Sequence, residues 1–193
     1  MNFNLNLDLG RWVFKMRGGL WTLLFLIILF MTRHTDPEII LLSLVIILAG
    51  QLWRCWAAGT IMLYRGETVK AEGLTTTGPY ALMRNPLYFG NFLIGLGWSI
   101  ISGKTAVILF LASFIILYVM IIIPYEENFL AGKFGTAYEK YRERVGMFFP
   151  KKFPIENFKG NFDVDILSRS EVHTMLTTLT GTSIIVAWAL CYT

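Results

Sequence analysis

The sequence predicts an all-α fold, a polytopic membrane helix bundle. Of its 193 residues, 55% are hydrophobic and only 16% are charged, and the mean hydropathy is positive, which lies outside the balance of soluble domains. The apolar residues gather into separate runs, at 18–32, 39–53, 87–102, 105–124 and, more weakly, 175–192. A helix needs about 20 residues to cross a bilayer. Four to five transmembrane helices are therefore expected, of which only the fourth run is comfortably long.

The first run is expected to be a retained membrane helix. Arg11, Lys15 and Arg17 precede it, as in a signal peptide, but no small-residue cleavage site follows and further hydrophobic runs come after it. The second run continues through Gln51, Arg54 and Cys55 into a polar-tipped extension that emerges from the membrane, so its helix is predicted to end near Gly66. The third and fourth runs are separated by two residues and form a membrane hairpin.

The residues 151–193 form a tail with a different pattern. Residues 151–173 are polar with scattered aromatics and are expected to be an interfacial loop. Residues 175–192 are rich in threonine and either span the membrane as a fifth helix or lie along the interface. Spanning is favoured, so the chain 1–193 is predicted to be a single membrane domain.

The basic residues predict the orientation. The N-terminal stretch, the segment 54–84 and the segment 133–169 together hold 15 of the 17 lysines and arginines, and the two turns between them hold only Arg33 and Lys104. The positive-inside rule places these basic stretches, and with them the N-terminus, in the cytoplasm. A basic cytoplasmic face against anionic lipid accounts for the net charge of +4, so the lipid bilayer is an expected partner and nucleic acid is not.

The first informative motif is "GPYALMRNPLYFG", residues 78–90. Gly78-Pro79 and Asn85-Pro86 are turn signals, and each proline biases the preceding residue away from the helical region. Pro86 suits the first turn of the third membrane helix, whose free amide groups favour an anionic or carboxylate ligand. Further along, Gly90 and Gly97 share one face of the helix, where glycines allow close helix packing.

The second motif is "IIIPYEENFLAGKFGTAYEKYRERVGMFFP", residues 121–150. Pro124 removes a backbone hydrogen bond near the end of the fourth run, so the helix should kink or restart there. The adjacent Glu126 and Glu127 follow at once. Carboxylates so close to hydrocarbon are costly, and although one of them could simply favour a helix N-terminus, the pair indicates a functional site.

An amphipathic cytoplasmic helix is expected after the two glutamates, because apolar side chains recur at steps of three or four residues, at Leu130, Phe134, Tyr138, Tyr141 and Val145. Gly132 and Gly135 weaken it and mark a bend or a close contact. Its apolar face either lies on the membrane or closes over residues 78–90, and the second arrangement would build a pocket. Arg142 and Arg144 are predicted on its outer face.

The two motifs and the hydrophobic hairpin between them resemble the integral membrane methyltransferases typified by isoprenylcysteine carboxyl methyltransferase and the phospholipid N-methyltransferases. The resemblance covers about residues 40–150. It implies a helical enzyme that binds S-adenosylmethionine in a cytoplasmic pocket roofed by the C-terminal helix, with a cofactor-binding and catalytic region at 78–150. The positions that match the family's cofactor region are Gly78, Pro79, Tyr80, Arg84, Asn85, Pro86, Tyr88, Gly90, Glu126 and Glu127.

The chemistry of S-adenosylmethionine suits these residue types. Glutamate matches its ammonium, arginine or helix amides match its carboxylate, and tyrosine rings match its sulfonium. Methyl transfer mainly requires alignment and the exclusion of water. The candidate catalytic residues are Arg84, Glu126, Glu127 and Tyr138, the last three as proton acceptors for an amine or hydroxyl substrate.

Two positions depart from the family pattern. Asn85 stands where the family usually has histidine, and Met147 where it usually has an arginine. Asparagine can still donate and accept hydrogen bonds. If the arginine holds a substrate carboxylate, its absence makes an amine, thiol or lipid hydroxyl acceptor at least as suitable as a carboxylate. The substrate is thus expected to be hydrophobic, amphipathic or lipidated.

Two other classes remain as alternatives. The same membrane core resembles the C-terminal part of sterol reductases, which use NADPH, although the arginine of their arginine-aspartate-glutamate element is missing before Glu126 and Glu127. A non-catalytic membrane protein of the same fold is the second alternative. No metal-ligand spacing occurs among the two cysteines and two histidines, so no metal is expected.

Overall fold

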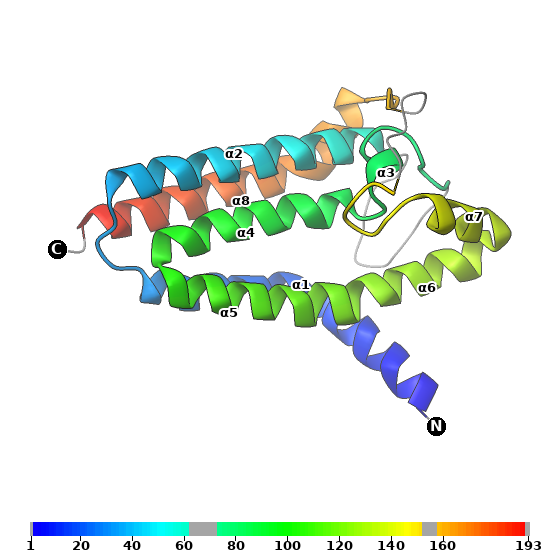
Figure 1. Ribbon diagram of the computed structural model, residues 1–193, viewed down its shortest axis with the longest axis horizontal. Coiled ribbons are helices and arrows are strands. Elements are labelled where there is room, and N and C mark those ends of the chain that lie inside the picture. The colour runs from blue at the N-terminus through cyan, green and yellow to red at the C-terminus, as the bar shows by residue number, and fades with distance from the viewer. Residues whose placement is uncertain (1, 62–72, 152–157, 192–193) are drawn as a thin grey trace.

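The computed structural model describes residues 2–61, 73–151 and 158–191, and helices dominate these ranges, with no strand among them. The membrane helices lie side by side, and α3 and α7 lie together at the end of the bundle opposite the C-terminus (Figure 1). The predicted all-α bundle is thus confirmed. The helices are α1 (Asn2–Met31), α2 (Pro37–Thr60), α3 (Pro79–Leu82), α4 (Pro86–Ser102), α5 (Lys104–Phe114), the π-helix η1 (Ile115–Ile122), α6 (Ile123–Phe134), α7 (Thr136–Arg144) and α8 (Val164–Cys191).

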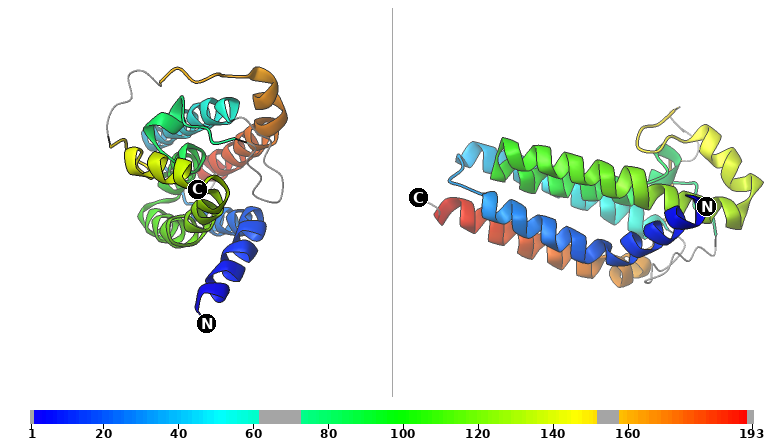
Figure 2. Two further views of the ribbon diagram at one scale, coloured as in Figure 1. Left: turned by 90° about the vertical axis from the view of Figure 1, so that its right-hand side faces the viewer. Right: turned by 90° about the horizontal axis from the view of Figure 1, so that it is seen from below.

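Four helical stretches among the described residues are long and apolar enough to cross a membrane, namely Leu9–Met31, Pro37–Thr60, Lys104–Phe134 and Val164–Cys191. The third run forms the shorter helix α4 of 17 residues. The views in Figure 2 show α8 running along the bundle beside the other long helices. The protein is therefore an integral membrane protein, and the tail contributes a helix of spanning length.

Two helix boundaries differ from the expected ones. Helix α2 ends at Thr60, because Ile61 turns to an extended conformation with φ −73° and ψ 129°, and the expected end near Gly66 lies outside the described residues. Helix α8 begins at Val164, within the expected interfacial loop. Asp163 explains this start, since its Oδ1 accepts hydrogen bonds from the backbone N–H of Asp165 at 2.8 Å and of Ile166 at 3.2 Å, as a capping aspartate does.

The break expected at Pro124 takes the form of a change in hydrogen bonding. The helix from Lys104 passes through η1, where the N–H of Ile123 donates to the carbonyl of Tyr118, five residues earlier. Such π-type turns accommodate the loss of a regular bond next to a proline. The chain bends at Gly135, the residue between α6 and α7. Its φ of +51° is a conformation that favours glycine.

Helices α2 and α4 pack closely through glycines, as predicted for Gly90 and Gly97. A Cβ on Gly90 would lie 2.9 Å from the carbonyl oxygen of Gly50, and a Cβ on Gly97 would lie 2.9 Å from the carbonyl oxygen of Ser43. Both distances are too short for a side chain. This seam sets the start of α4, and with it the first motif, against the C-terminal half of α2.

Candidate active site

The first motif folds into a turn, a single helical turn and an extended pair of residues. Gly78 has φ +60° and ψ −132° and precedes Pro79, which opens α3. Met83 then forms a parallel bridge with Gly146. The backbone N–H of Arg84 donates to the carbonyl of Gly146 at 2.9 Å, and that of Asn85 to the carbonyl of Met147 at 3.3 Å. Main-chain hydrogen bonds therefore join the first motif to the chain that follows α7.

Arg84 joins the two motifs through its side chain as well. Its Nε lies 2.9 Å from Oε1 of Glu127, its Nη2 lies 3.2 Å from Oε2, and both side chains are about nine-tenths buried. Its Nη1 donates to the carbonyl of Val145 at 2.6 Å. Asn85 donates from Nδ2 to the same Oε1 at 3.3 Å. Such bidentate, charge-assisted bonds fix geometry as well as charge, and asparagine takes part in them in place of the usual histidine.

Helix α7 closes over the first motif, as one of the two predicted arrangements requires. The hydroxyl of Tyr141 donates to the carbonyl of Tyr80 at 2.7 Å. Tyr138, Tyr141 and Val145 form a buried cluster, which is the apolar stripe expected from the sequence. The predicted roof over residues 78–90 is thus present, and it includes Tyr138, which is only 1% exposed.

Burial disfavours ionisation of the two roof tyrosines, Tyr138 and Tyr141. It raises the pKa of Tyr138 and that of Tyr141 well above 10.0, and the nearby Glu127 carboxylate raises the pKa of Tyr138 further. Both effects disfavour the phenolate. Tyr138 therefore stays protonated at neutral pH, which favours a role as hydrogen-bond donor over the role of proton acceptor that the sequence left open.

The raised pKa values predict how stability depends on pH. A group whose pKa is higher in the folded state stabilises the fold fully below its unfolded pKa, and this contribution falls as the pH rises beyond it. For Tyr138 and Tyr141 the unfolded value is 10.0. When thermal unfolding is followed in detergent, we expect the melting temperature to drop between about pH 10 and 12. The drop should be smaller in Tyr138→Phe, which lacks one of the two hydroxyls. An equal drop in Tyr138→Phe would contradict this assignment.

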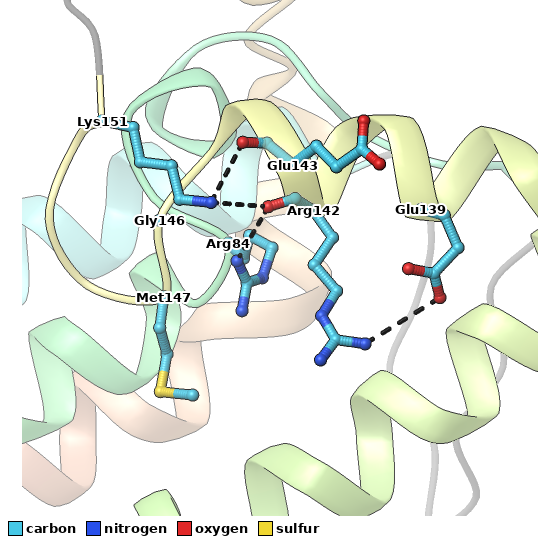
Figure 3. Close-up of a pocket in the computed structure, with 7 residues that line it drawn as sticks. All are labelled: Arg84, Glu139, Arg142, Glu143, Gly146, Met147 and Lys151. Carbon is cyan, nitrogen blue, oxygen red and sulfur yellow. Dashed lines mark hydrogen bonds and ion pairs between the residues drawn. The ribbon is translucent and has the colours of Figure 1, made fainter.

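An open pocket of about 460 Å³ lies beside Arg84 (Figure 3). It is lined by three basic and two acidic side chains with two further residues, namely Arg84, Arg142, Lys151, Glu139, Glu143, Gly146 and Met147. The side chain of Arg142 is half exposed, in agreement with its predicted outer position, and it also lines this pocket. Its Nη1 lies 3.9 Å from Oε1 of Glu139. Met147, where the resemblance implies an arginine, lines the same pocket.

Sequence reasoning missed Lys151 as a residue of this pocket. Its Nζ donates to the carbonyls of Arg142 at 3.2 Å and Glu143 at 3.0 Å, at the C-terminal end of α7. A cation there is favoured by the helix dipole. The signal in the sequence was a lysine just past the end of an amphipathic helix, but the polar composition around it is that of a loop.

The other predicted site residues lie along the same end of the bundle. Glu126 is buried in the first turn of α6, next to the Arg84–Glu127 pair in the chain. Tyr88 is 2% exposed on α4, and its ring lies 4.6 Å from that of Tyr118. Gly90 faces α2 and the side chain of Arg54. The structure thus brings Arg84, Asn85, Glu127 and the roof together, whereas it directs Gly90 to helix packing.

A second charged pair, Arg54 and Glu171, was not foreseen. Arg54 was counted with the cytoplasmic basic residues, but its guanidinium is buried and lies 2.7 Å from the carboxylate of Glu171 on α8. Only Arg54 gave a signal, as an arginine at the end of an apolar run, where a charge is costly without a partner; Glu171 stands in a polar stretch that gave none.

Metal ligands do not cluster in the part of the chain that the structure describes, where no three His, Cys, Asp or Glu side chains could hold an ion together. The charged residues at the candidate site are instead engaged with one another and with main-chain carbonyls.

Comparison with known proteins connects these features to a family. The chain is 31% identical over 154 residues to the nickel-cobalt-cadmium resistance protein NccN of Alcaligenes xylosoxydans xylosoxydans, covering 74% of this chain and 68% of that protein. It is 32% identical over 90 residues to methanethiol S-methyltransferase 2 of Bradyrhizobium diazoefficiens, covering 47% and 34%. It is 28% identical over 81 residues to the Delta(14)-sterol reductase LBR of Gallus gallus, covering 40% and 12%.

No solved structure matches the chain. The model of the phospholipid methyltransferase family matches residues 38–137, which include α2, the first motif, the membrane hairpin and both glutamates. The chain therefore belongs to the phospholipid methyltransferase family.

Proposed function

We propose that this protein transfers a methyl group from S-adenosylmethionine to a hydrophobic or amphipathic acceptor at the cytoplasmic surface of the membrane. The observation that carries the proposal is the Arg84–Glu127 pair, which joins the two family motifs beneath the roof of α7 and beside a pocket that carries both signs of charge. Family membership supports methyl transfer as the reaction.

The residues present fit S-adenosylmethionine. Its ammonium and carboxylate require groups of both signs, and the pocket offers arginine, lysine and glutamate side chains in about 460 Å³, within the usual range for small-molecule sites. Buried Glu126 adjoins the Arg84–Glu127 pair and adds a second carboxylate. Arg84, Arg142 or Lys151 would hold the carboxylate of the amino acid portion and Glu139 or Glu143 its ammonium, with Glu126 and Glu127 buried behind Arg84.

S-Adenosylmethionine supplies an activated methyl group on a positively charged sulfur. The chain's own residues then have to orient the acceptor, exclude water and remove a proton where the acceptor carries one. The roof of α7 shields Tyr80 from water, but the pocket beside Arg84 is open, so the bound cofactor and acceptor would have to complete the exclusion of water. Glu126 and Glu127 are the candidate proton acceptors, and the protonated Tyr138 is a candidate hydrogen-bond donor.

The acceptor is proposed to be a thiol or an amine before a carboxylate. The methanethiol S-methyltransferase among the relatives is named for a thiol, and Met147 supplies no charge where the family usually has an arginine. Lys151 and Arg142 line the pocket, however, and could bind a carboxylate or phosphate on the acceptor. Carboxylates therefore belong in the same substrate screen.

The test is calorimetric titration of S-adenosylmethionine into detergent-solubilised protein. We expect micromolar binding by the intact chain, and at least tenfold weaker binding by Glu127→Gln and Tyr88→Ala. Glu38→Gln is the matched control, because Glu38 is exposed in the first turn of α2. This turn is at the opposite end of α2 from the half that packs against the first motif. Circular dichroism and thermal unfolding show whether each variant is folded.

A well-folded intact chain that fails to bind S-adenosylmethionine would overturn the proposal. NADPH is then the next titrant, since the match to a sterol reductase is the observation that favours this alternative. Binding of NADPH would indicate a reductase, and binding of neither molecule would favour a non-catalytic membrane protein of the same fold.

A further inference from the structure

The tail packs against the first motif where three small residues meet. Gly160 lies just before α8, Gly78 begins the first motif and Thr60 ends α2. A Cβ on Gly160 would lie 2.5 Å from Cγ2 of Thr60 and 3.0 Å from Cα of Gly78. A side chain there would overlap Thr60 and crowd the main chain of the first motif. Gly78 has φ +60° and ψ −132°, a conformation that residues other than glycine rarely adopt, so the contact lies at a constrained turn.

Two further contacts fix the tail segment 158–163 to the end of α2. The backbone N–H of Asp163 donates to the carbonyl of Gly59 at 2.8 Å. The ring of Phe158 lies 5.2 Å from that of Trp56. The segment therefore has a defined position beside the first motif.

Tyr80 connects the tail to the roof of α7. Tyr80 is 7% exposed and belongs to a buried cluster formed by α2, α3 and α4, against which Leu167 of α8 packs. Its main-chain carbonyl accepts the hydrogen bond from the hydroxyl of Tyr141 on α7 at 2.7 Å. The same residue of α3 is thus held by the tail through the cluster around its side chain and by the roof through its main chain.

The pocket begins four residues after Tyr80, at Arg84. The backbone N–H of Arg84 donates to Gly146 at 2.9 Å, and its side chain is paired with Glu127. Only the single turn of α3 and Met83 separate Arg84 from the residues that the tail contacts. Because a packed interior transmits displacements, a shift at the tail contacts changes the position of Arg84.

We propose that the tail positions the first motif, with Gly160 and Leu167 as positioning residues that keep Arg84 in place at the pocket. Where it concerns cofactor binding, this inference rests on the proposed function. Both residues lie outside the segment 38–137 that matches the family. The tail would thus complete a site whose motifs stand in the matched segment or directly after it.

The attachment of α8 to the bundle also uses contacts away from the first motif. A Cβ on Gly181 would lie 3.0 Å from Cζ2 of Trp98. Nε1 of Trp98 donates to Oγ1 of Thr182 at 2.9 Å. None of these three residues belongs to the first motif, so a change at Gly181 disturbs α8 without a direct contact to Gly78 or Tyr80.

Hydrogen–deuterium exchange of the solubilised protein, followed by mass spectrometry, tests the proposal on the first motif itself. The N–H of Ala81 donates to Gly78 at 3.1 Å and that of Arg84 to Gly146 at 2.9 Å, so a peptide covering 78–86 contains protected amides. We expect Gly160→Ala, which crowds Gly78, to raise exchange in this peptide about tenfold. Leu167→Ala, which uncovers the cluster around Tyr80 without adding an atom, should act in the same direction.

Each variant has a matched control on α8. Gly181→Ala adds the same methyl group at the Trp98 contact, and Leu176→Ala truncates a leucine that is 56% exposed. Both should leave exchange at 78–86 unchanged. Thermal unfolding of all four variants shows whether each is folded and how far its melting temperature falls.

The second measurement is the dissociation constant of S-adenosylmethionine, determined by calorimetry. We expect about tenfold weaker binding in Gly160→Ala and Leu167→Ala, and less than a twofold change in the two controls. A control that lowers the melting temperature as much as Leu167→Ala but leaves binding intact would separate positioning from a general loss of stability.

Three results would overturn the positioning role. They are unchanged exchange at 78–86 in folded Leu167→Ala and Gly160→Ala, an equal rise in Gly181→Ala, and raised exchange with unchanged binding of S-adenosylmethionine. If Gly160→Ala does not fold, Leu167→Ala decides alone. If the intact chain binds no S-adenosylmethionine, the proposed function fails, and hydrogen exchange by itself decides whether the tail positions the first motif.

Discussion

Arg84→Ala is expected to abolish methyl transfer and to lower the free energy of unfolding by about 3–5 kcal/mol. The substitution leaves the Glu127 carboxylate, whose side chain is 10% exposed, without its cationic partner. It also removes the donor at 2.6 Å from the carbonyl of Val145, which holds the chain after α7. Thermal or denaturant unfolding in detergent measures the stability, and transfer of a labelled methyl group measures the activity.

Two further variants make the interpretation of Arg84→Ala specific. Arg84→Lys keeps the charge but cannot form the bidentate pair, so an intermediate loss is expected. Arg142→Ala is the control, because Arg142 is half exposed and lies 3.9 Å from Glu139, and such surface pairs contribute less than about 1 kcal/mol. Equal destabilisation by Arg84→Ala and Arg142→Ala would show that the Arg84–Glu127 pair is not the link between the motifs.

Gly90→Ala is expected to destabilise the protein by about 1–3 kcal/mol, as overpacking of a close interface does. The new Cβ would overlap Cγ of Arg54 and would lie 2.9 Å from the carbonyl oxygen of Gly50. Arg54 cannot easily move aside, because its guanidinium is bound to Glu171 and Asn91. The expected result is a lower melting temperature together with weaker S-adenosylmethionine binding, since α4 also carries Tyr88.

Gly132→Ala is the matched control for Gly90→Ala. Gly132 lies inside α6, and a Cβ there would meet no atom within 4 Å. Alanine should therefore stabilise this helix by up to about 1 kcal/mol through its higher helix propensity. A destabilising Gly132→Ala with a neutral Gly90→Ala would contradict the packing of α2 against α4 described above.

Much of the fold could be predicted from the sequence because its signals are local. Apolar runs of about 15–20 residues require helices in lipid, and the spacing of Tyr138, Tyr141 and Val145 predicts the buried stripe of α7. Gly135 was expected to mark a bend or a close contact, and in the structure it adopts φ +51° between α6 and α7. The start of α8 was missed because the capping aspartate, Asp163, stands in a polar stretch that resembles a loop.

The candidate site could be predicted only in part. Arg84, Asn85, Glu126 and Glu127 stand in two short motifs with turn signals or a membrane proline beside them, so they could be named from the sequence. Lys151 could not, because its role depends on the end of α7 returning to it. That Gly90 packs against a neighbouring helix could be predicted, but that this neighbour is α2 depends on the tertiary structure.

The sequence by itself determined that this protein is a helical membrane protein and which short motifs carry its polar chemistry, because hydropathy and turn propensity act between neighbouring residues. The tertiary structure decided which charges meet. Glu127 lies 43 residues from Arg84, and Glu171 lies 117 residues from Arg54. No local preference selects between partners at such separations. The choice follows from the packing of the helices, which removes each charge from water and leaves one opposite charge within reach.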